Sequence, residues 1–297
     1  MNQEKTLKSS CCTGSPVTET MPADKDAVRA QVSKAYANAV TLSVKEGDNG
    51  CCSNTLPVGI AAQTAGYSDG ETAEYSDAAQ SSFGCGNPLA FVGVNEGETV
   101  LDLGSGAGFD LLLASQKVGP EGRVIGVDMT DEMINVAREN IKQAGAANVE
   151  VRKGMIEELP VEDSSVDWVI SNCVINLSPQ KDNVFSEIAR VLKPGGRFSV
   201  SDIVAQDLPD DIRRLATAYS ACIGGAISEE QYLAGLTSAG LDSLQVTERL
   251  VYDEAQIRGM VGSDLAALGI PADLLDTQLG RVVGKVWSAK ITGRKPE

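Results

Sequence analysis

The sequence predicts an α/β protein whose core is a doubly wound, largely parallel sheet. From residue 99 onward, short apolar segments alternate with segments in which apolar residues recur at helical spacing. The first apolar segment, residues 100–103, runs into the stretch Gly-Ser-Gly-Ala-Gly, which suits a sharp turn from strand to helix. Strands that alternate with helices of this length form parallel sheets covered on both faces. With 297 residues, the chain can bury such a core.

The elements of this sheet can be placed in chain order. We expect strands at residues 100–103, 123–128, 149–152, 166–170, 197–203, 244–252 and 285–293, the last of them antiparallel near the sheet edge. We expect helices at 109–117, from a Thr130 cap to about 144, from Ser178-Pro179 to about 193, and at 228–239. A helical insertion after Asp207 carries Cys222, and a longer helical excursion precedes the last strand.

The segment before the sheet has a different composition. Residues 1–25 are polar without an apolar period, which indicates a flexible tail. Asp26 is expected to cap a helix that runs to about residue 42 and has Tyr36 on its apolar face. A polar loop and a short helix at 73–81 then lead to the first strand. The expected organisation is a tail (1–25), an N-terminal helix with a Cys-bearing loop (26–75), a ligand-binding core with the Cys222 insertion (76–228), and C-terminal strands and helices that complete the sheet (229–297).

Composition excludes several classes of protein. The net charge of −16 repels phosphate backbones and anionic lipid, so neither nucleic acid nor membrane is an expected partner. Histidine is absent, which excludes Ser-His-Asp triads and Cys/His zinc sites. The N-terminus lacks the order of a signal peptide, and no apolar run approaches the roughly 18 residues of a membrane span. We therefore expect a cytoplasmic protein, and a monomer.

The glycine-rich turn indicates a nucleoside ligand without a phosphate. Gly104, Gly106 and Gly108 form the pattern GxGxG, whereas a pyrophosphate cofactor favours a third glycine one residue later. Asp128 ends the second strand about twenty residues on, where a carboxylate can accept hydrogen bonds from both ribose hydroxyls. Residues 154–160 follow the third strand and can lie along an adenine. Asn172 ends the fourth strand at the same edge of the sheet.

These motifs together resemble class I S-adenosylmethionine methyltransferases, which have a Rossmann-like fold. The matching features are Asp-Leu-Gly-Ser-Gly-Ala-Gly, the acidic residue after the second strand and the Leu-Lys-Pro-Gly-Gly turn, and the resemblance covers residues 76–297. It implies S-adenosylmethionine as the cofactor, held by the core at 76–228. The candidate cofactor-binding residues are Asp102, Gly104, Ser105, Gly106, Gly108, Asp128, Met129, Met155, Ile156 and Asn172.

The cysteines indicate the second ligand. There are seven, at positions 11, 12, 51, 52, 85, 173 and 222, and their odd number and irregular spacing argue against a disulfide framework. Thiols without histidine suit a soft ion, yet the paired spacing of closed zinc sites is missing. Trivalent arsenic needs three thiolates and keeps a lone pair that serves as nucleophile, so no general base is required. Cys51, Cys85, Cys173 and Cys222 can all converge on the carboxyl edge of the sheet.

At these cysteines the sequence resembles arsenite S-adenosylmethionine methyltransferases. The matching segments are Ser-Asn-Cys-Val-Ile-Asn-Leu at 171–177, Gly-Cys-Gly at 84–86, Cys-Ile-Gly-Gly-Ala at 222–226 and Asn-Gly-Cys at 49–51. The resemblance implies that Cys51, Cys85, Cys173 and Cys222 bind arsenic and serve its redox steps. Cys52 remains an alternative to Cys51, and Cys11 and Cys12 either deliver metalloid or are dispensable. The family often has Tyr-Tyr where this chain has Ser82-Phe83, so the resemblance implies no aromatic hydroxyl there.

The expected function is therefore arsenite methylation by in-line transfer from S-adenosylmethionine. The expected partners are arsenite, methylated trivalent arsenicals, and thiol reductants such as glutathione or thioredoxin, which reopen the disulfide left by each cycle. Two alternatives remain open. A methyltransferase for a small organic acceptor such as a quinone predicts a carboxylate or tyrosine base and indifference to Cys173→Ser. A non-catalytic metalloid binder predicts arsenite binding without a methylated product.

Overall fold

The computed structural model describes residues 20–46, 67–82, 84, 86–89, 93–220, 222–257 and 280–297. Its helices are α1 (Lys25–Glu46), α3 (Asp69–Glu74), α4 (Ser76–Gln80), α5 (Phe109–Val118), α6 (Asp131–Ala144), α7 (Lys181–Val191), α8 (Asp210–Arg213), α9 (Ala216–Ser220) and α10 (Glu229–Ser238), with a 3-10 turn at Ile175–Leu177. Its strands are β1 (Thr99–Leu103), β2 (Arg123–Asp128), β3 (Val149–Lys153), β4 (Val166–Asn172), β5 (Leu192–Ala205), β6 (Asp242–Val251) and β7 (Val286–Arg294).

These strands form one seven-stranded sheet in the order β3-β2-β1-β4-β5-β7-β6. Neighbouring strands from β3 to β5 are parallel, and β7 is antiparallel to both β5 and β6. The predicted doubly wound α/β fold, completed by C-terminal strands, is confirmed. Because the strand order reverses between β1 and β4, their carboxyl ends flank the crevice in which such folds bind ligands.

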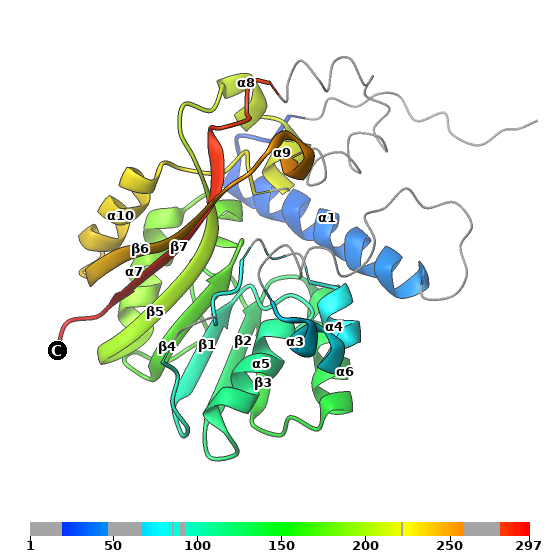
Figure 1. Ribbon diagram of the computed structural model, residues 1–297, viewed down its shortest axis with the longest axis vertical. Coiled ribbons are helices and arrows are strands. Elements are labelled where there is room, and N and C mark those ends of the chain that lie inside the picture. The colour runs from blue at the N-terminus through cyan, green and yellow to red at the C-terminus, as the bar shows by residue number, and fades with distance from the viewer. Residues whose placement is uncertain are drawn as a thin grey trace, which may run out of the picture.

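The helices cover both faces of the sheet and one of its ends. Figure 1 shows α7 and α10 on one face, α5 and α6 on the other, and α1, α8 and α9 beyond the carboxyl ends of the parallel strands. The buried core has a corresponding division into a cluster under α7 and α10, a cluster under α5, and a third that joins α1 to α8 and to β5. The third cluster contains Cys173 and Cys222. The carboxyl end of the parallel strands is thus covered by helices.

A carboxylate interrupts the otherwise apolar strand β1. In β1, Val100, Leu101 and Leu103 are fully buried, as expected of a central strand with both faces covered. Asp102 lies between them and is equally buried, at 2% exposure. A buried carboxylate is costly unless it is compensated, so Asp102 is a candidate for contact with a ligand.

Two predicted helix starts were wrong, for local reasons. Asp24, rather than Asp26, caps α1, because its Oδ1 accepts the backbone N–H of Ala27 at 2.9 Å. The helix predicted from Ser178 begins only at Lys181, because the chain first makes the 3-10 turn at 175–177. The predicted start of α6 after Thr130 is confirmed, although the Thr130 side chain makes no cap hydrogen bond and its hydroxyl lies 3.2 Å from the hydroxyl of Ser33.

The segment before β1 also differs from the prediction. In place of one helix at 73–81 there are two short helices that meet at Tyr75. The first starts earlier than predicted because Ser68 and Glu71 form a reciprocal capping box. Most of the predicted tail lies outside the described residues. The same holds for most of the loop with Cys51 and Cys52 and for most of the excursion before the last strand.

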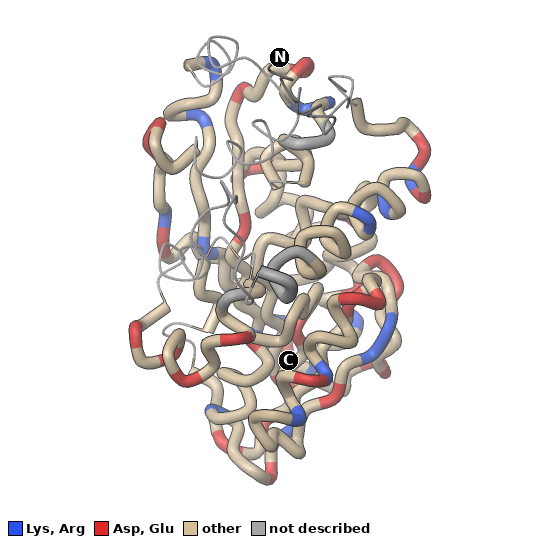
Figure 2. Tube along the Cα trace, turned by 90° about the vertical axis from the view of Figure 1, so that its right-hand side faces the viewer, with Lys and Arg blue, Asp and Glu red and all other residues tan. Residues whose placement is uncertain are grey.

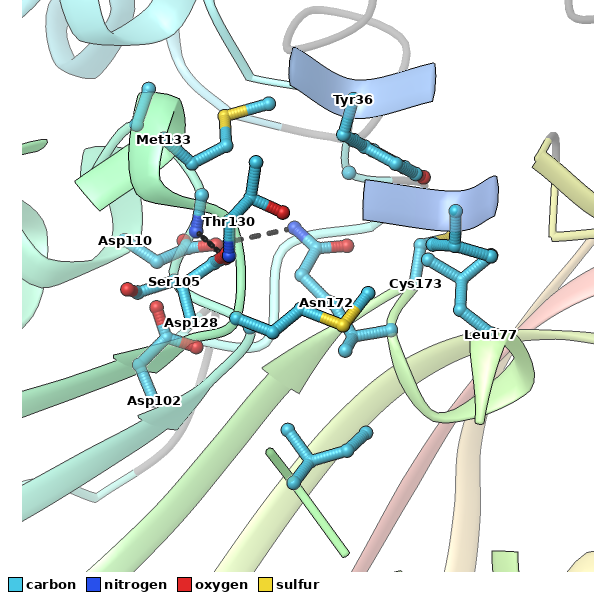
Figure 3. A pocket seen from close by; sticks show the side chains of 18 of the residues that line it. Tyr36, Asp102, Ser105, Asp110, Asp128, Thr130, Met133, Asn172, Cys173 and Leu177 are labelled. Carbon is cyan, nitrogen blue, oxygen red and sulfur yellow. Dashed lines mark hydrogen bonds between the residues drawn. The ribbon is translucent and has the colours of Figure 1, made fainter. Parts of the chain in front are cut away.

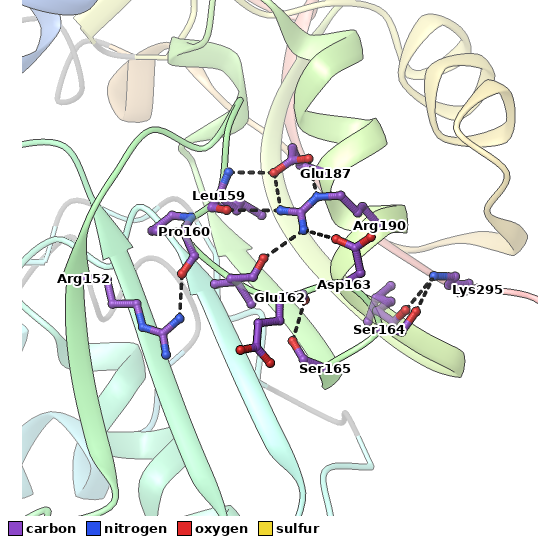
Figure 4. A network of polar contacts seen from close by, with 12 residues as sticks. Arg152, Leu159, Pro160, Glu162, Asp163, Ser164, Ser165, Glu187, Arg190 and Lys295 are labelled. Carbon is purple, nitrogen blue, oxygen red and sulfur yellow. Dashed lines mark hydrogen bonds and ion pairs between the residues drawn. The ribbon is translucent and has the colours of Figure 1, made fainter.

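The loop after β3 is held by an arginine. Arg190 of α7 donates to the carbonyls of Leu159 and Val161, and also pairs with Glu187 and Asp163 (Figure 4). Glu187 in turn accepts the backbone N–H of Leu159 at 2.6 Å. This network ties the loop to a helix that is packed on the sheet. The loop can therefore present its first residues at a fixed position at the sheet edge.

Acidic residues are spread along the chain rather than gathered in a single patch (Figure 2). Within the described residues, no helix has the length and apolar character needed to cross a membrane.

Candidate active site

A cavity lies at the carboxyl ends of β1, β2 and β4, beneath α1 (Figure 3). The empty space within it is about 950 Å³, which includes space open to solvent. Its walls are the turn after β1, the first turn of α5, the ends of β2 and β4, the loop after β3 and one face of α1. Segments far apart in the chain thus meet around one space.

The turn after β1 needs its glycines for two different reasons. Gly104, Gly106 and Gly108 have φ values of +66°, +51° and +89°, which side-chain-bearing residues rarely adopt. At Gly104 space is also missing, since a Cβ there would lie 2.5 Å from both γ-methyl groups of Val174. At Gly106 a Cβ would meet nothing within 4 Å. The backbone at Gly106 is therefore left free to face a ligand.

This difference gives a stability prediction. Gly104→Ala should lower the free energy of unfolding by about 2–4 kcal/mol, from left-handed strain of about 1–2 kcal/mol plus overlap with Val174. Gly106→Ala should lower the free energy of unfolding by the backbone strain alone, about 1–2 kcal/mol. Urea unfolding of the two variants measures the difference, and equal losses would contradict the role given to Val174.

Asp128 is held at the end of β2 by the same turn. Its carboxylate accepts the backbone N–H of Gly106 at 3.0 Å and that of Thr130 at 2.8 Å. Burial raises the pKa of this carboxyl, while the two backbone hydrogen bonds oppose that rise. The group is fixed in direction and lines the cavity, so it can accept hydrogen bonds from a ligand's hydroxyl groups.

Carboxylates dominate the polar lining of the cavity. Asp102, Asp110 and Asp128 line it together, and within the described part of the chain none of the three forms an ion pair with Lys or Arg. Burial, and then the charges of Asp110 and Asp128, raise the pKa of Asp102 well above its usual range. In addition, the buried Ser105 hydroxyl has no hydrogen-bond partner within the described residues. Such a lining suits a cationic ligand that also carries polar groups.

Cys173 and Cys222 meet at the other end of this cavity. Cys173 directly follows β4 and lines the cavity, while Cys222 follows α9. The Cys222 thiol donates to the backbone carbonyl of Cys173, with the sulfur 2.7 Å from the oxygen. Cys173 is disulfide-bonded, Cys222 is a free thiol, and the partner of Cys173 is not among the described residues. The structure therefore brings together two cysteines that are 49 positions apart.

Both cysteines have strained backbones. Cys173 has φ +58° and Cys222 has φ +61°, a conformation that costs about 1–3 kcal/mol for a residue other than glycine. Backbone hydrogen bonds hold them there, from the Cys173 N–H to the Ser201 carbonyl at 2.8 Å and from the Cys222 N–H to the Tyr219 carbonyl at 2.9 Å. Strain of this kind is concentrated at functional sites.

The surroundings of Cys222 keep its thiol protonated. It is buried at 3% exposure, and burial raises its pKa well above the usual range. The Tyr36 hydroxyl on α1 lies 4.0 Å from the Cys222 sulfur and donates to the carbonyl of Ser220 at 3.2 Å. Burial also raises the pKa of Tyr36 well above its usual range. Neither group is thus suited to act as a base.

Helix α1 is fastened over the cavity by an ion pair. Arg29 donates to Glu157 at 3.2 Å and to Gln180 at 2.6 Å, and Glu157 also accepts from the Ser178 hydroxyl. The side chains of Arg29 and Glu157 are 14% and 8% exposed, so solvent screens this pair only partly. Arg29 and Tyr36 lie on the same face of α1, and this attachment holds Tyr36 at the cysteines.

Loss of the attachment should be visible in α1 alone. Arg29→Met leaves the buried Glu157 without its cation, at a cost of about 1–3 kcal/mol. Amide hydrogen exchange in α1 should become at least several-fold faster, while exchange in β1 stays unchanged. Lys34→Met, at an exposed position of the same helix, is the control. Unchanged exchange in the Arg29 variant would mean that other contacts hold the helix.

The structure places the predicted site residues as follows. The cavity is lined by Asp102, Gly104, Ser105, Gly106, Asp128, Met129, Ile156, Asn172 and Cys173, and Cys222 lies against Cys173. Two predicted residues, Gly108 and Met155, do not line the cavity. Gly108 is the residue before α5, and Met155 is 40% exposed. Cys11, Cys12, Cys51, Cys52 and Cys85 lie outside the described residues. Gly84 and Gly86, on either side of position 85, are described and lie against Asn172.

Sequence reasoning missed several lining residues, although some signal was present. Asp110 is two residues after Gly108, and it is the one charged residue in the otherwise apolar stretch at 109–114. Arg29 and Tyr36 are two helical turns apart on α1, which shows that they share a face. Nothing in the sequence indicates that this face covers the cavity. Tyr36 also supplies an aromatic hydroxyl that could not be expected from Ser82-Phe83.

Comparisons with known proteins agree with this geometry. Residues 94–243 match a family described as a methyltransferase domain. An arsenite methyltransferase of Halobacterium salinarum is 46% identical over 244 residues, which are 78% of this chain and 62% of that protein. The crystal structure of an arsenic(III) S-adenosylmethionine methyltransferase from Chlamydomonas reinhardtii matches with a TM-score of 0.56 and 31% identity, over 82% of this chain and 75% of that one. A demethylmenaquinone methyltransferase of Listeria monocytogenes is 36% identical over 116 residues, 39% of this chain and 49% of that protein.

The doubly wound fold, the glycine turn and the acidic cavity define an S-adenosylmethionine-dependent methyltransferase domain. Within that class, the chain belongs to the arsenite methyltransferase family. It spans 62% of the length of the Halobacterium relative.

Proposed function

We propose that this protein transfers methyl groups from S-adenosylmethionine to trivalent arsenic bound by its cysteines. The observation that carries the proposal is the contact between Cys173 and Cys222 at a cavity that also has the features of a nucleoside site. A soft acceptor and a cationic donor would then share one space. Relatives named as arsenite methyltransferases support the same reading.

The residues present fit the donor. Asp128 would accept hydrogen bonds from the ribose hydroxyls, and Met129 and Ile156 would lie along the adenine. The turn at 104–106 and Asn172 would place the methionine portion, and the Ser105 hydroxyl has an unused hydrogen bond to offer. The acidic lining compensates the donor's positive charge. When bound, S-adenosylmethionine supplies an electrophilic methyl group on a sulfonium.

The acceptor side fits arsenite better than a metal cation. Arsenite carries three hydroxyl groups, so each thiol that binds it gives its proton to a hydroxide, which leaves as water while an As–S bond replaces an As–O bond. A thiol that is neutral, like Cys222, can react in this way. A zinc ion would require thiolates and would release protons to solvent. Cys173 and Cys222 supply two sulfur ligands in this proposal, and Cys85 or Cys51 the third.

The proposed transfer has the arsenic lone pair attack the methyl carbon. An As–C bond forms, the S–C bond of the donor breaks, and its electron pair stays on the sulfur of S-adenosylhomocysteine. No proton is transferred in this step, which agrees with the absence of histidine. The protein contributes by holding both reactants in line, an effect that can lower the activation free energy by about 7–11 kcal/mol.

A redox step would complete the cycle. Methylation oxidises arsenic formally by two electrons, and two cysteine thiols can return them by forming a disulfide and releasing two protons. The disulfide at Cys173 supports this step. Glutathione or thioredoxin would then reopen the disulfide by thiol exchange, so we place the protein in a reducing compartment such as the cytoplasm.

Methylation of a quinone is the weaker candidate. The similarity to a demethylmenaquinone methyltransferase spans 39% of this chain. An acceptor oxygen or carbon would need a base near the transferred methyl. The tyrosine beside Cys222 has a raised pKa, and the carboxylates of the cavity are assigned to the donor in the proposal above. The thiols would then have no role.

The test is product identification. Protein, arsenite, a thiol reductant and methyl-labelled S-adenosylmethionine are incubated, and arsenic species are separated and identified by mass. We expect labelled methylarsenic, with repeated turnover only when reductant is present. Arsenite binding without any methylated arsenic would favour a metalloid binder, and label transferred to demethylmenaquinone in a parallel incubation that supplies it in place of arsenite would favour the other alternative.

A further inference from the structure

Asp110 stands out among the lining residues because the proposal above gives it no role of its own beyond its negative charge. It lies in the first turn of α5, directly after the glycine turn, lines the cavity and is 7% exposed. A buried carboxylate loses much of its hydration, a cost that a nearby cation can offset. Within the described residues, Asp110 has no Lys or Arg in an ion pair.

Two neutral groups fix the direction of this carboxylate. The Tyr67 hydroxyl donates to one oxygen at 2.6 Å, and the Asn172 side-chain amide donates to the other at 3.3 Å (Figure 3 shows the second contact). The same Asn172 nitrogen lies closer to the Tyr67 oxygen, at 2.9 Å, and to the Gly86 carbonyl, at 2.6 Å, so its two N–H groups are shared among three acceptors. Asp110 is therefore held rigidly by a residue before the sheet and by the end of β4.

Position along the cavity indicates which part of the donor would reach it. Asp128, proposed to hold the ribose, lies at the end of β2, and Cys173, proposed to hold arsenic, follows Asn172 at the end of β4. Asp110 lies beside Asn172. The donor's methionine portion extends from the ribose and carries an α-ammonium group, a cation able to make charge-assisted hydrogen bonds to a carboxylate.

We propose that Asp110 binds the α-ammonium group of the methyl donor, and that Tyr67 and Asn172 position the carboxylate for it. This inference rests on the proposal that the cavity takes S-adenosylmethionine, and it assigns the specificity for an amino-acid tail to one side chain. Burial raises the pKa of Asp110 to about 6. The hydrogen bonds from Tyr67 and Asn172 oppose this rise, and the charge of Glu71 adds to it. The carboxylate is therefore ionised at neutral pH, as binding of an ammonium group requires.

Two probes that differ in the tail test the proposal. S-adenosylhomocysteine contains the α-ammonium group, whereas 5′-methylthioadenosine keeps the adenine, ribose and thioether but lacks the amino-acid portion. Dissociation constants for both are measured by calorimetry at neutral pH with wild type, Asp110→Asn, Tyr67→Phe and the exposed control Asp77→Asn.

Asp110→Asn should weaken S-adenosylhomocysteine binding about 10- to 100-fold, the range for a hydrogen bond to a charged group, and change methylthioadenosine binding less than about twofold. Tyr67→Phe should give a smaller loss with the same selectivity, and Asp77→Asn no change. Equal weakening of both probes in the Asp110 and Tyr67 variants would show a merely structural role and overturn the proposal, as would unchanged binding of both. If wild type binds neither probe, the proposed donor itself is wrong. Failure of arsenite methylation with the selectivity intact would leave this inference standing.

Discussion

Cys222→Ser is expected to lower arsenite methylation by at least about 100-fold in kcat/KM, equivalent to about 2.7 kcal/mol of transition-state stabilisation. Serine offers a hard oxygen in place of a soft sulfur, and trivalent arsenic strongly prefers sulfur. Cys173→Ser should have an effect of similar size, since the two residues would bind the same arsenic. Initial rates of methylarsenic formation, with S-adenosylmethionine near saturation, measure both losses.

The control for the cysteine variants is donor binding. Serine is nearly the same size as cysteine and meets the same backbone constraint, so S-adenosylhomocysteine should bind both variants within about twofold of wild type. Intact donor binding together with lost methylation locates the defect at the acceptor. Full activity in both variants would remove the thiolate-acceptor proposal and leave a methyltransferase domain with another substrate.

The second large effect is expected at Asp128. Asp128→Ala removes a carboxylate that accepts two backbone N–H groups and, in the proposal, two ribose hydroxyls. Hydrogen bonds to a charged group contribute about 1.5–3 kcal/mol each, so S-adenosylhomocysteine affinity should fall by at least about 10- to 100-fold. Calorimetric titration measures the loss.

Asp131→Asn is the matched control for this variant. Asp131 lies three positions further along, is exposed, and pairs with Lys153 outside the cavity. Its replacement should leave donor affinity unchanged. Arsenite binding by reduced Asp128→Ala should also be close to wild type, because the cysteines are at the other end of the cavity. A donor affinity that survives in Asp128→Ala would place the nucleoside elsewhere.

The sheet was predictable from sequence because its signals are local. Buried strands such as Val100 to Leu103 are continuously apolar, and the glycine turn and Asp128 fall where strands end, so β1 and β2 were placed within a residue. Helix starts were less predictable, because a cap depends on which side chain reaches a backbone N–H. At α1, Asp24 and Asp26 are equivalent in type, and only the fold decides between them.

The site was predictable to the extent that topology fixes it. Asn172 and Cys173 had to lie at the carboxyl edge, because they follow a parallel strand. The contact between Cys222 and Cys173 depends on how α8 and α9 fold back, and sequence could give it only through family resemblance. The sequence could not predict that α1 covers the cavity, because the apolar face of a helix does not indicate which surface it packs against. The pairing of Arg29 with Glu157 spans 128 positions and likewise has no local signal.

The most direct test of the central claim is X-ray absorption at the arsenic edge, on reduced protein loaded with one equivalent of arsenite and S-adenosylhomocysteine. We predict a first shell of sulfur alone, from which Cys222→Ser and Cys173→Ser each remove one sulfur ligand. A first shell that keeps its oxygens in wild type, or a sulfur shell unchanged in both variants, would contradict the placement of the acceptor at these two cysteines.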